Sequence, residues 1–165
     1  EIRLSLVGSE MCIRDRAYRE AIALRPDRPQ AYYNLGAALN NSGHYVEAAQ
    51  RLLEAKERLP VGSVGWATAT AHAFVLLVQE ACAEVAKPEW WNDEGLKALS
   101  ARVVRAAPDD GAAHRVRAMV LSGLPAGAWE AGPRSAAELR EAATHFERAA
   151  ALHTCLLYTS PSPRD

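Results

Sequence analysis

The stretch Ala31–Pro60, AYYNLGAALNNSGHYVEAAQRLLEAKERLP, decides the fold of this chain. Its apolar residues recur at intervals of three and four, which is the period of an amphipathic helix. Gly43 interrupts this pattern, and Pro60 ends it because proline lacks a backbone N–H and its ring clashes with the preceding helical turn. The stretch therefore predicts two helices, at 29–41 and 45–58, joined by a tight turn.

The remainder of the chain also has the composition of a helical protein. Alanine, leucine, glutamate and arginine, which are good helix formers, dominate it, and glycine and proline fall between the periodic segments. No segment alternates with a period of two for long enough to be a strand. The fold class we predict is all-α, with further helices at 17–24, 64–86, 93–106, 111–122 and 135–153.

The spacing of the prolines indicates a repeat. Pro26 and Pro60 are 34 residues apart, and the segment between them resembles a tetratricopeptide repeat (TPR), a helix–turn–helix unit of that period. The positions that carry the resemblance are Tyr32, Leu35, Gly36, Ala48, Leu52, Ala55 and Pro60. Leu39 stands where the repeat usually has tyrosine, and Leu52 where an aromatic residue is common. The resemblance implies antiparallel helical hairpins stacked as an α-solenoid. Gly36 and Ala48 are then small because the two helices cross closely there.

The repeat pattern extends on both sides with more departures. The clear repeat is 29–60, and Ala17–Pro26 looks like the second helix of a preceding unit. We expect degenerate repeats at 61–108 and 109–153, the latter with a loop insertion at 125–134 that is rich in glycine and proline. Together these segments make up a TPR-like region at 17–153.

The two ends of the chain resemble translated sequencing adapter. Codons that are permitted for Cys155–Asp165 have a reverse complement that encodes Leu6–Asp15 residue for residue. Unrelated protein termini have no reason to be antisense copies of each other. We therefore expect segments 1–16 and 154–165 to be adapter-derived artefacts that are not native to the protein, and we base the fold and function on 17–153.

Composition and motifs weigh against several classes of function. The net charge of −1 lacks the basic footprint of a protein that binds nucleic acid or an anionic membrane. Between the two expected artefacts Cys82 is the sole cysteine, and the five histidines show no metal-binding spacing. We read Cys82 as a small buried side chain and Asp110 as the cap of the following helix. No catalytic motif is present, so we expect no enzyme activity, no metal and no cofactor.

The resemblance implies that the concave face of the repeats binds an extended or helical segment of a partner protein. On the clear repeat the residues expected on this face are Gln30, Tyr33, Asn34, Ala37, Asn40 and Asn41. The alternative interpretation is a merely solvated face. A clamp for a terminal carboxylate is disfavoured by Tyr33 and Ala37, which stand where such clamps have lysine and asparagine. The asparagine ladder of TPR-containing sugar transferases is broken at Thr68 and Val116.

Two adjacent tryptophans, Trp90 and Trp91, form a second feature of interest. They are interpreted either as an anchor folded back on the repeats, which we favour, or as a hot spot for a partner. The function we predict is a non-enzymatic protein-interaction scaffold. The alternative is the helical arm of a larger enzyme, such as a protein O-glycosyltransferase. Such a region also has exposed repeat ends through which we expect it to associate with itself, and the cytoplasm is the compartment we favour.

Overall fold

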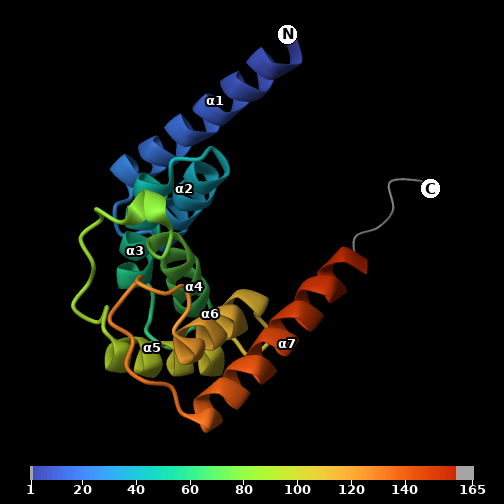
Figure 1. Cartoon of the computed structure of the whole chain (residues 1–165). Helices are drawn as coiled ribbons and strands as arrows, with labels where there is room; N and C mark the ends of the chain where they lie inside the picture. Colours follow the sequence, from blue (N-terminus) through green and yellow to red (C-terminus); the bar gives the residue numbers. More distant parts are fainter. Residues whose placement is uncertain (1, 159–165) are drawn as a thin grey trace. The chain divides into compact units, whose positions relative to one another are not determined.

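The computed structural model describes the backbone of residues 2–158 and the side chains of residues 13–153. Within this part of the chain the secondary structure is entirely helical, which confirms the all-α fold class. The elements in order are α1 (Ile2–Leu24), α2 (Pro29–Asn41), α3 (Tyr45–Arg58), α4 (Val64–Leu77), the short 3₁₀ helix η1 (Glu80–Cys82), α5 (Asp93–Ala106), α6 (Gly111–Ser122) and α7 (Ala136–Tyr158) (Figure 1). The chain divides into two compact units, of which the first ends at Ala86 and the second begins at Lys87.

In the first unit each helix packs on the next one along the chain. α1 packs on α2, α2 on α3, and α3 on α4, while η1 lies against α3 (Figure 1). Leu35 and Leu39 of α2 and Leu52 of α3 are almost completely buried. Tyr32 of α2 and Ala55 of α3 share a core cluster with Ala69 of α4. Three successive helices thus form one apolar core, as expected for stacked helical hairpins.

Helices α2 and α3 cross most closely at Gly36. A β-carbon at this position would lie 2.8 Å from Cγ of Leu52 and 3.2 Å from the backbone oxygen of Ala48. Ala48 itself has no exposed surface. The sequence-based prediction that Gly36 and Ala48 are small because the helices cross there is confirmed.

The two ends of the hairpin are defined by local chemistry. Pro29 occupies the first turn of α2, where its missing N–H is not needed. Gly43 has a φ of 80°, a left-handed conformation that turns the chain into α3. At the far end, Tyr32 donates a hydrogen bond to the Pro26 oxygen at 3.0 Å, and Arg58 donates to the same oxygen at 2.9 Å. The helix boundaries expected at 29–41 and 45–58 are confirmed.

The expectation of one helix over 64–86 is wrong, because α4 ends at Leu77. Gln79 leaves the helical region with a ψ of 147°, and the chain continues into η1. This turn places Cys82, which has no exposed surface, against the rest of the unit and brings η1 onto α3. The burial of Cys82 expected from the sequence is confirmed, although the residue lies in a 3₁₀ turn and not on a long helix.

The second unit consists of α5, α6 and α7, with α6 packed on both of the others (Figure 1). Val103 of α5, Leu121 of α6 and Ala142 of α7 are buried in its core. Its helices begin at side-chain caps. The Asp110 carboxylate accepts a hydrogen bond from the Ala112 amide at 2.8 Å, which confirms its predicted role as a cap.

A capping box starts α7. The hydroxyl of Ser135 accepts a hydrogen bond from the Glu138 amide at 3.2 Å, and the Glu138 carboxylate accepts one from the Ser135 amide at 2.8 Å. The loop expected at 125–134 therefore occupies the connection between α6 and this box. The expected adapter segments 1–16 and 154–165 lie largely outside the described side chains and remain a proposal, as do the repeat boundaries at 61–108 and 109–153.

We predict that Gly36→Leu lowers the free energy of unfolding by about 2–3 kcal/mol, because the larger side chain wedges α2 away from α3. Gly36→Ala should change it less, since alanine gains about 1 kcal/mol of helix propensity that offsets part of the steric cost. Urea denaturation followed by circular dichroism measures both. The matched control is Ala37→Leu on the opposite face of α2, for which we expect a change within about 0.5 kcal/mol. Equal effects at the two positions would contradict a close crossing at Gly36.

Candidate partner-binding surface

The six residues expected to bind a partner share one face of α2. The buried residues of this helix include Leu35, Gly36 and Leu39, which face the core. The helical period places the six candidates about half a turn away from these residues. Three of them are exposed: Gln30, Asn40 and Asn41. The other three are half-buried: Tyr33, Asn34 and Ala37. We call this set the α2 face.

Helix α4 contributes one contact to the α2 face. The hydroxyl oxygen of Tyr33 lies 3.0 Å from Nδ1 of His72, and the two rings are stacked with their centroids 5.7 Å apart. A neutral His72 with its proton on Nε2 accepts this hydrogen bond from Tyr33. The positions of His72 and Tyr33 along the chain do not indicate this contact. It becomes visible only when α2 and α4 are folded onto α3.

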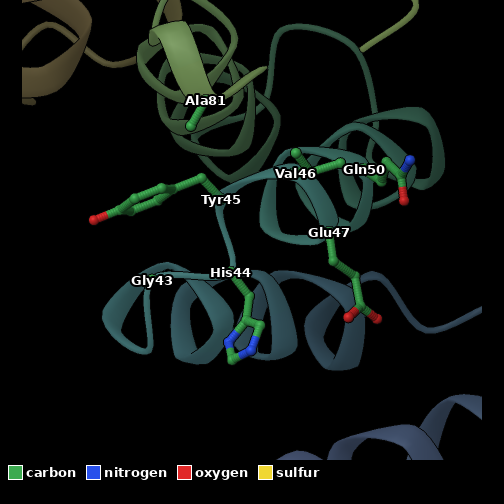
Figure 2. Close-up of a pocket in the computed structure, with 7 residues that line it drawn as sticks. All are labelled: Gly43, His44, Tyr45, Val46, Glu47, Gln50 and Ala81. Carbon is green, nitrogen blue, oxygen red and sulfur yellow. The ribbon is translucent and has the colours of Figure 1, made fainter. Parts of the chain in front are cut away.

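An open pocket of about 330 Å³ lies elsewhere in the first unit, at the turn between α2 and α3 (Figure 2). Its lining residues are Gly43, His44, Tyr45, Val46, Glu47, Gln50 and Ala81. Figure 2 shows Ala81 of η1 and Tyr45 of α3 on the same side of this pocket. The Glu47 carboxylate already has a partner within the chain, because Arg19 of α1 donates hydrogen bonds to both of its oxygens at 2.7 and 3.0 Å. None of the residues predicted for partner binding lines this pocket.

The tryptophans lie in the second unit, in the segment that leads into α5. The indole N–H of Trp91 donates a hydrogen bond of 2.9 Å to the Ala128 oxygen in the loop between α6 and α7. Trp91 also meets the edge of Trp129 in that loop, with ring centroids 6.5 Å apart, and Trp129 is 8% exposed. Trp90 packs beside Trp91 and is half-buried. These contacts support the proposal that the tryptophans anchor the segment.

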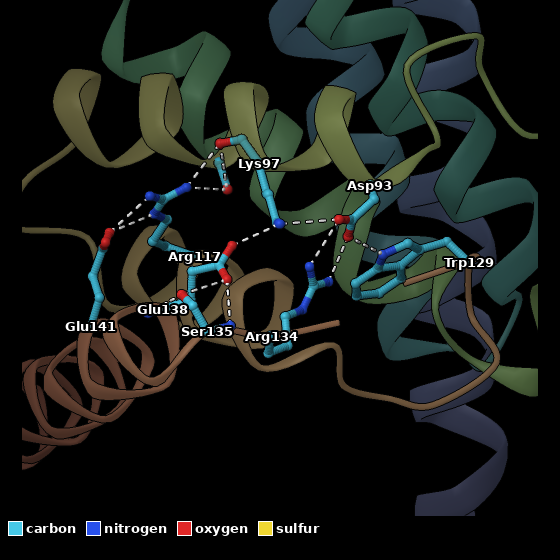
Figure 3. Close-up of polar contacts among 9 residues, drawn as sticks. Asp93, Lys97, Arg117, Trp129, Arg134, Ser135, Glu138 and Glu141 are labelled. Atoms are coloured by element: carbon cyan, nitrogen blue, oxygen red, sulfur yellow. Dashed lines mark hydrogen bonds and ion pairs between the residues drawn. The ribbon is translucent and has the colours of Figure 1, made fainter. Parts of the chain in front are cut away.

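Asp93 ties the same loop to the start of α5 (Figure 3). Arg134 donates to both of its carboxylate oxygens, at 2.9 and 2.5 Å, and the Trp129 indole donates at 3.3 Å. Lys97 lies 3.1 Å from Asp93 and 2.7 Å from Glu138. The Arg134 hydrogen bonds hold the pKa of Asp93 far below its usual range, and Lys97 lowers the pKa of Glu138 to about 2. Nothing in the sequence beyond the types of these residues indicates the cluster, because they come from separate segments of the chain.

Arg117 continues the polar cluster between the three helices of the second unit (Figure 3). It donates two hydrogen bonds to a Glu141 oxygen of α7, at 3.0 and 2.8 Å. It also donates to the backbone oxygen of Lys97 in α5 at 2.8 Å. One guanidinium on α6 therefore connects both neighbouring helices. Such charge-assisted hydrogen bonds hold the geometry more strongly than neutral ones.

Two histidines also meet in this unit. Nδ1 of His114 lies 2.7 Å from Nδ1 of His145, and Nε2 of His114 lies 2.8 Å from the Pro108 oxygen. Because a carbonyl only accepts, Nε2 of His114 carries a proton, and a neutral His114 accepts a hydrogen bond from His145 at Nδ1. Burial lowers the pKa of His145. Repulsion from Arg117, and from His114 when it is protonated, acts in the same direction, and the Glu141 carboxylate acts against it. The sequence does not indicate this contact, because it depends on how α6 and α7 pair.

In the part of the chain whose side chains are described, no group of three or more His, Cys, Asp or Glu side chains is arranged to hold a metal ion. Cys82 is a buried cysteine. No helix there combines the length and the apolar character needed to cross a bilayer.

Comparison with known protein families identifies a match in the first unit. A family model described as TPR repeat matches residues 16–43, which cover the end of α1, all of α2 and the turn that follows. No curated protein sequence matches the chain. The match and the all-helical, sequentially packed architecture support a TPR-type repeat in this region. The TPR repeat is generally a module for interactions between proteins.

We predict that Trp91→Ala destabilises the second unit by about 2 kcal/mol, because it removes a half-buried ring and leaves the Ala128 oxygen without its donor. Trp91→Phe should have a smaller effect, since it removes the N–H and keeps most of the packing. Thermal unfolding and the rate of proteolysis in the loop 123–135 report the change. Glu130→Ala, an exposed position in the same loop, is the control. Unchanged melting after Trp91→Ala, together with loss of partner binding, would favour a hot spot.

We also predict that stability falls as the pH is lowered through the ordinary titration range of histidine. The folded chain holds the pKa of His145 below its usual value, so the unfolded chain binds this proton more readily. The full contribution is present above the unfolded pKa and is lost as the pH falls through the folded one. Urea denaturation from about pH 5 to about pH 8 measures this slope. His145→Gln should flatten it, whereas His153→Gln, an exposed position on the same helix, should leave it unchanged.

Proposed function

We propose that this chain is a non-enzymatic protein-interaction scaffold that binds an extended or helical segment of a partner protein on the α2 face. The observation that carries the proposal is the division of α2 into two opposite sides. One side is buried in the core, and on the other side three of the six side chains are exposed and three are half-buried, with Tyr33 also packed against the edge of the core. The TPR-type repeat at the same place supports a protein as the partner.

The chemistry of the α2 face suits the main chain of a bound segment. Gln30, Asn34, Asn40 and Asn41 each carry an amide that both donates and accepts hydrogen bonds, which matches the N–H and C=O groups of a peptide. Ala37 is small and allows a backbone to approach α2 closely. Tyr33, held by His72, adds a ring of fixed orientation for an apolar side chain.

The α2 face carries no charged residue, and this bears on the kind of segment it binds. A terminal carboxylate or a phosphate is usually bound by lysine or arginine. We therefore propose that the partner is recognised within its chain, through main-chain hydrogen bonds and apolar contacts. Nucleic acid and membrane are not proposed as partners, because the net charge of −1 provides no basic patch for phosphates. A cytoplasmic location remains part of the proposal.

A library of random peptides displayed on phage, selected on the immobilised full chain, tests the proposal. Selected peptides are then synthesised and titrated against variants by fluorescence anisotropy. We expect Ala37→Arg to weaken binding more than tenfold, because the long side chain blocks approach to α2. Asn34→Ala should weaken binding by about 1 kcal/mol, the typical worth of one hydrogen bond.

Gln50→Ala is the matched control, since Gln50 is exposed on α3 and lines the open pocket. Circular dichroism should show all three variants folded. If peptides bind wild type and Ala37→Arg equally but lose affinity for Gln50→Ala, the binding site is the open pocket and not the α2 face. Peptides that lose affinity for none of the variants would contradict the proposal.

A further inference from the structure

Helix α7 has an apolar stripe that remains exposed to a large extent. Leu139 is 48% exposed and Phe146 is 39% exposed, and Ala143 and Ala150 are exposed as well. These four residues follow one another at intervals of four, three and four, so they lie along one side of the helix. We call them the α7 stripe. A neighbouring side of α7, which includes the buried Ala142, packs on α6.

The corresponding side of α3 shows what such a stripe normally does in this chain. Ala142, Phe146 and Ala149 repeat the spacing of Ala48, Leu52 and Ala55, so that Ala143 corresponds to Ala49. Ala49 and Leu52 are 0% and 2% exposed, because α3 lies between α2 and α4. The same positions on α7 are exposed. A second helix is what fits against the α7 stripe.

We propose that this helix is α7 of a second copy of the chain, packed antiparallel in a two-fold symmetric dimer. Arg140 and Glu147, both exposed, flank the α7 stripe on the side away from α6 and are seven residues apart. When two stripes pair antiparallel around Ala143 and Phe146, Arg140 of each copy faces Glu147 of the other. The stripe and its charges are therefore complementary to themselves, as a two-fold interface requires.

The charges also select the direction of pairing. A parallel pair would turn the flank that carries Arg140 and Glu147 toward the opposite flank of the partner helix, so that these charges would not meet. The antiparallel pair brings the two charged flanks together and forms both attractions. The stripe is only about 17 Å long at 1.5 Å per residue, so the contact is smaller than a standard stable interface. We expect a weak dimer with a dissociation constant on the order of 0.1 mM.

Sedimentation velocity of the full chain from about 5 µM to about 1 mM, a range that brackets this constant, tests the proposal. The wild type should shift from monomer to dimer within it. Arg140→Glu creates two repulsive contacts by symmetry and should raise the dissociation constant about tenfold, as should Glu147→Arg. The double variant Arg140→Glu with Glu147→Arg exchanges the two charges and should restore dimerisation. That rescue is specific for the antiparallel register.

Arg148→Glu is the matched control: it makes the same charge change as Arg140→Glu, at an exposed position about half a turn around α7 from the stripe, and should dimerise like the wild type. Phe146→Lys should abolish the dimer. Circular dichroism verifies that each variant folds. A wild type that stays monomeric up to about 1 mM would overturn the proposal and leave the stripe to a different protein. A dimer that responds equally to the single and double charge variants, or to Arg148→Glu, would also overturn it.

Discussion

The first unit depends on the close approach of α2 and α3 at Gly36. A β-carbon there would meet Leu52 at 2.8 Å, so the absence of a side chain sets how near the two helices lie. This distance lets Tyr32 join Ala55 and Ala69 in one cluster. It also fixes which side of α2 remains outside the core. The proposed partner-binding face is thus a consequence of the packing on the opposite side of the same helix.

In the second unit, polar side chains hold the helices and their connecting loop together. Its connection between α6 and α7 is long, and a loop of this kind has no apolar core of its own to order it. Asp93 supplies that order by binding Arg134 and Trp129, while Trp91 binds the Ala128 oxygen. Arg117 adds a bond from α6 to each neighbouring helix. Buried or half-buried charges are stable here because each finds a partner of opposite sign.

The helix ends followed from the sequence wherever one residue has a local effect. Pro29, Gly43 and Asp110 each act through their own backbone or side chain, and the structure places each of them at the predicted boundary. The end of α4 did not follow, because residues 78–86 contain neither glycine nor proline and read as helix. The chain turns there because a turn buries Cys82 and packs η1 on α3. The helix propensity of residues 78–86 carries no information about the burial that this turn provides.

The candidate surface could likewise be predicted from the sequence only in part. The six residues of the α2 face could be named from the sequence, because the helical period alone decides which residues oppose Leu35 and Leu39. That Tyr33 meets His72, and that His114 meets His145, is decided by how separate helices pair. The exposure of Phe146 is a tertiary property as well, since the same spacing on α3 is buried. Sequence determined the helices, their caps and their polar and apolar sides. Tertiary structure decided which sides meet, because burial depends on neighbours that are distant along the chain.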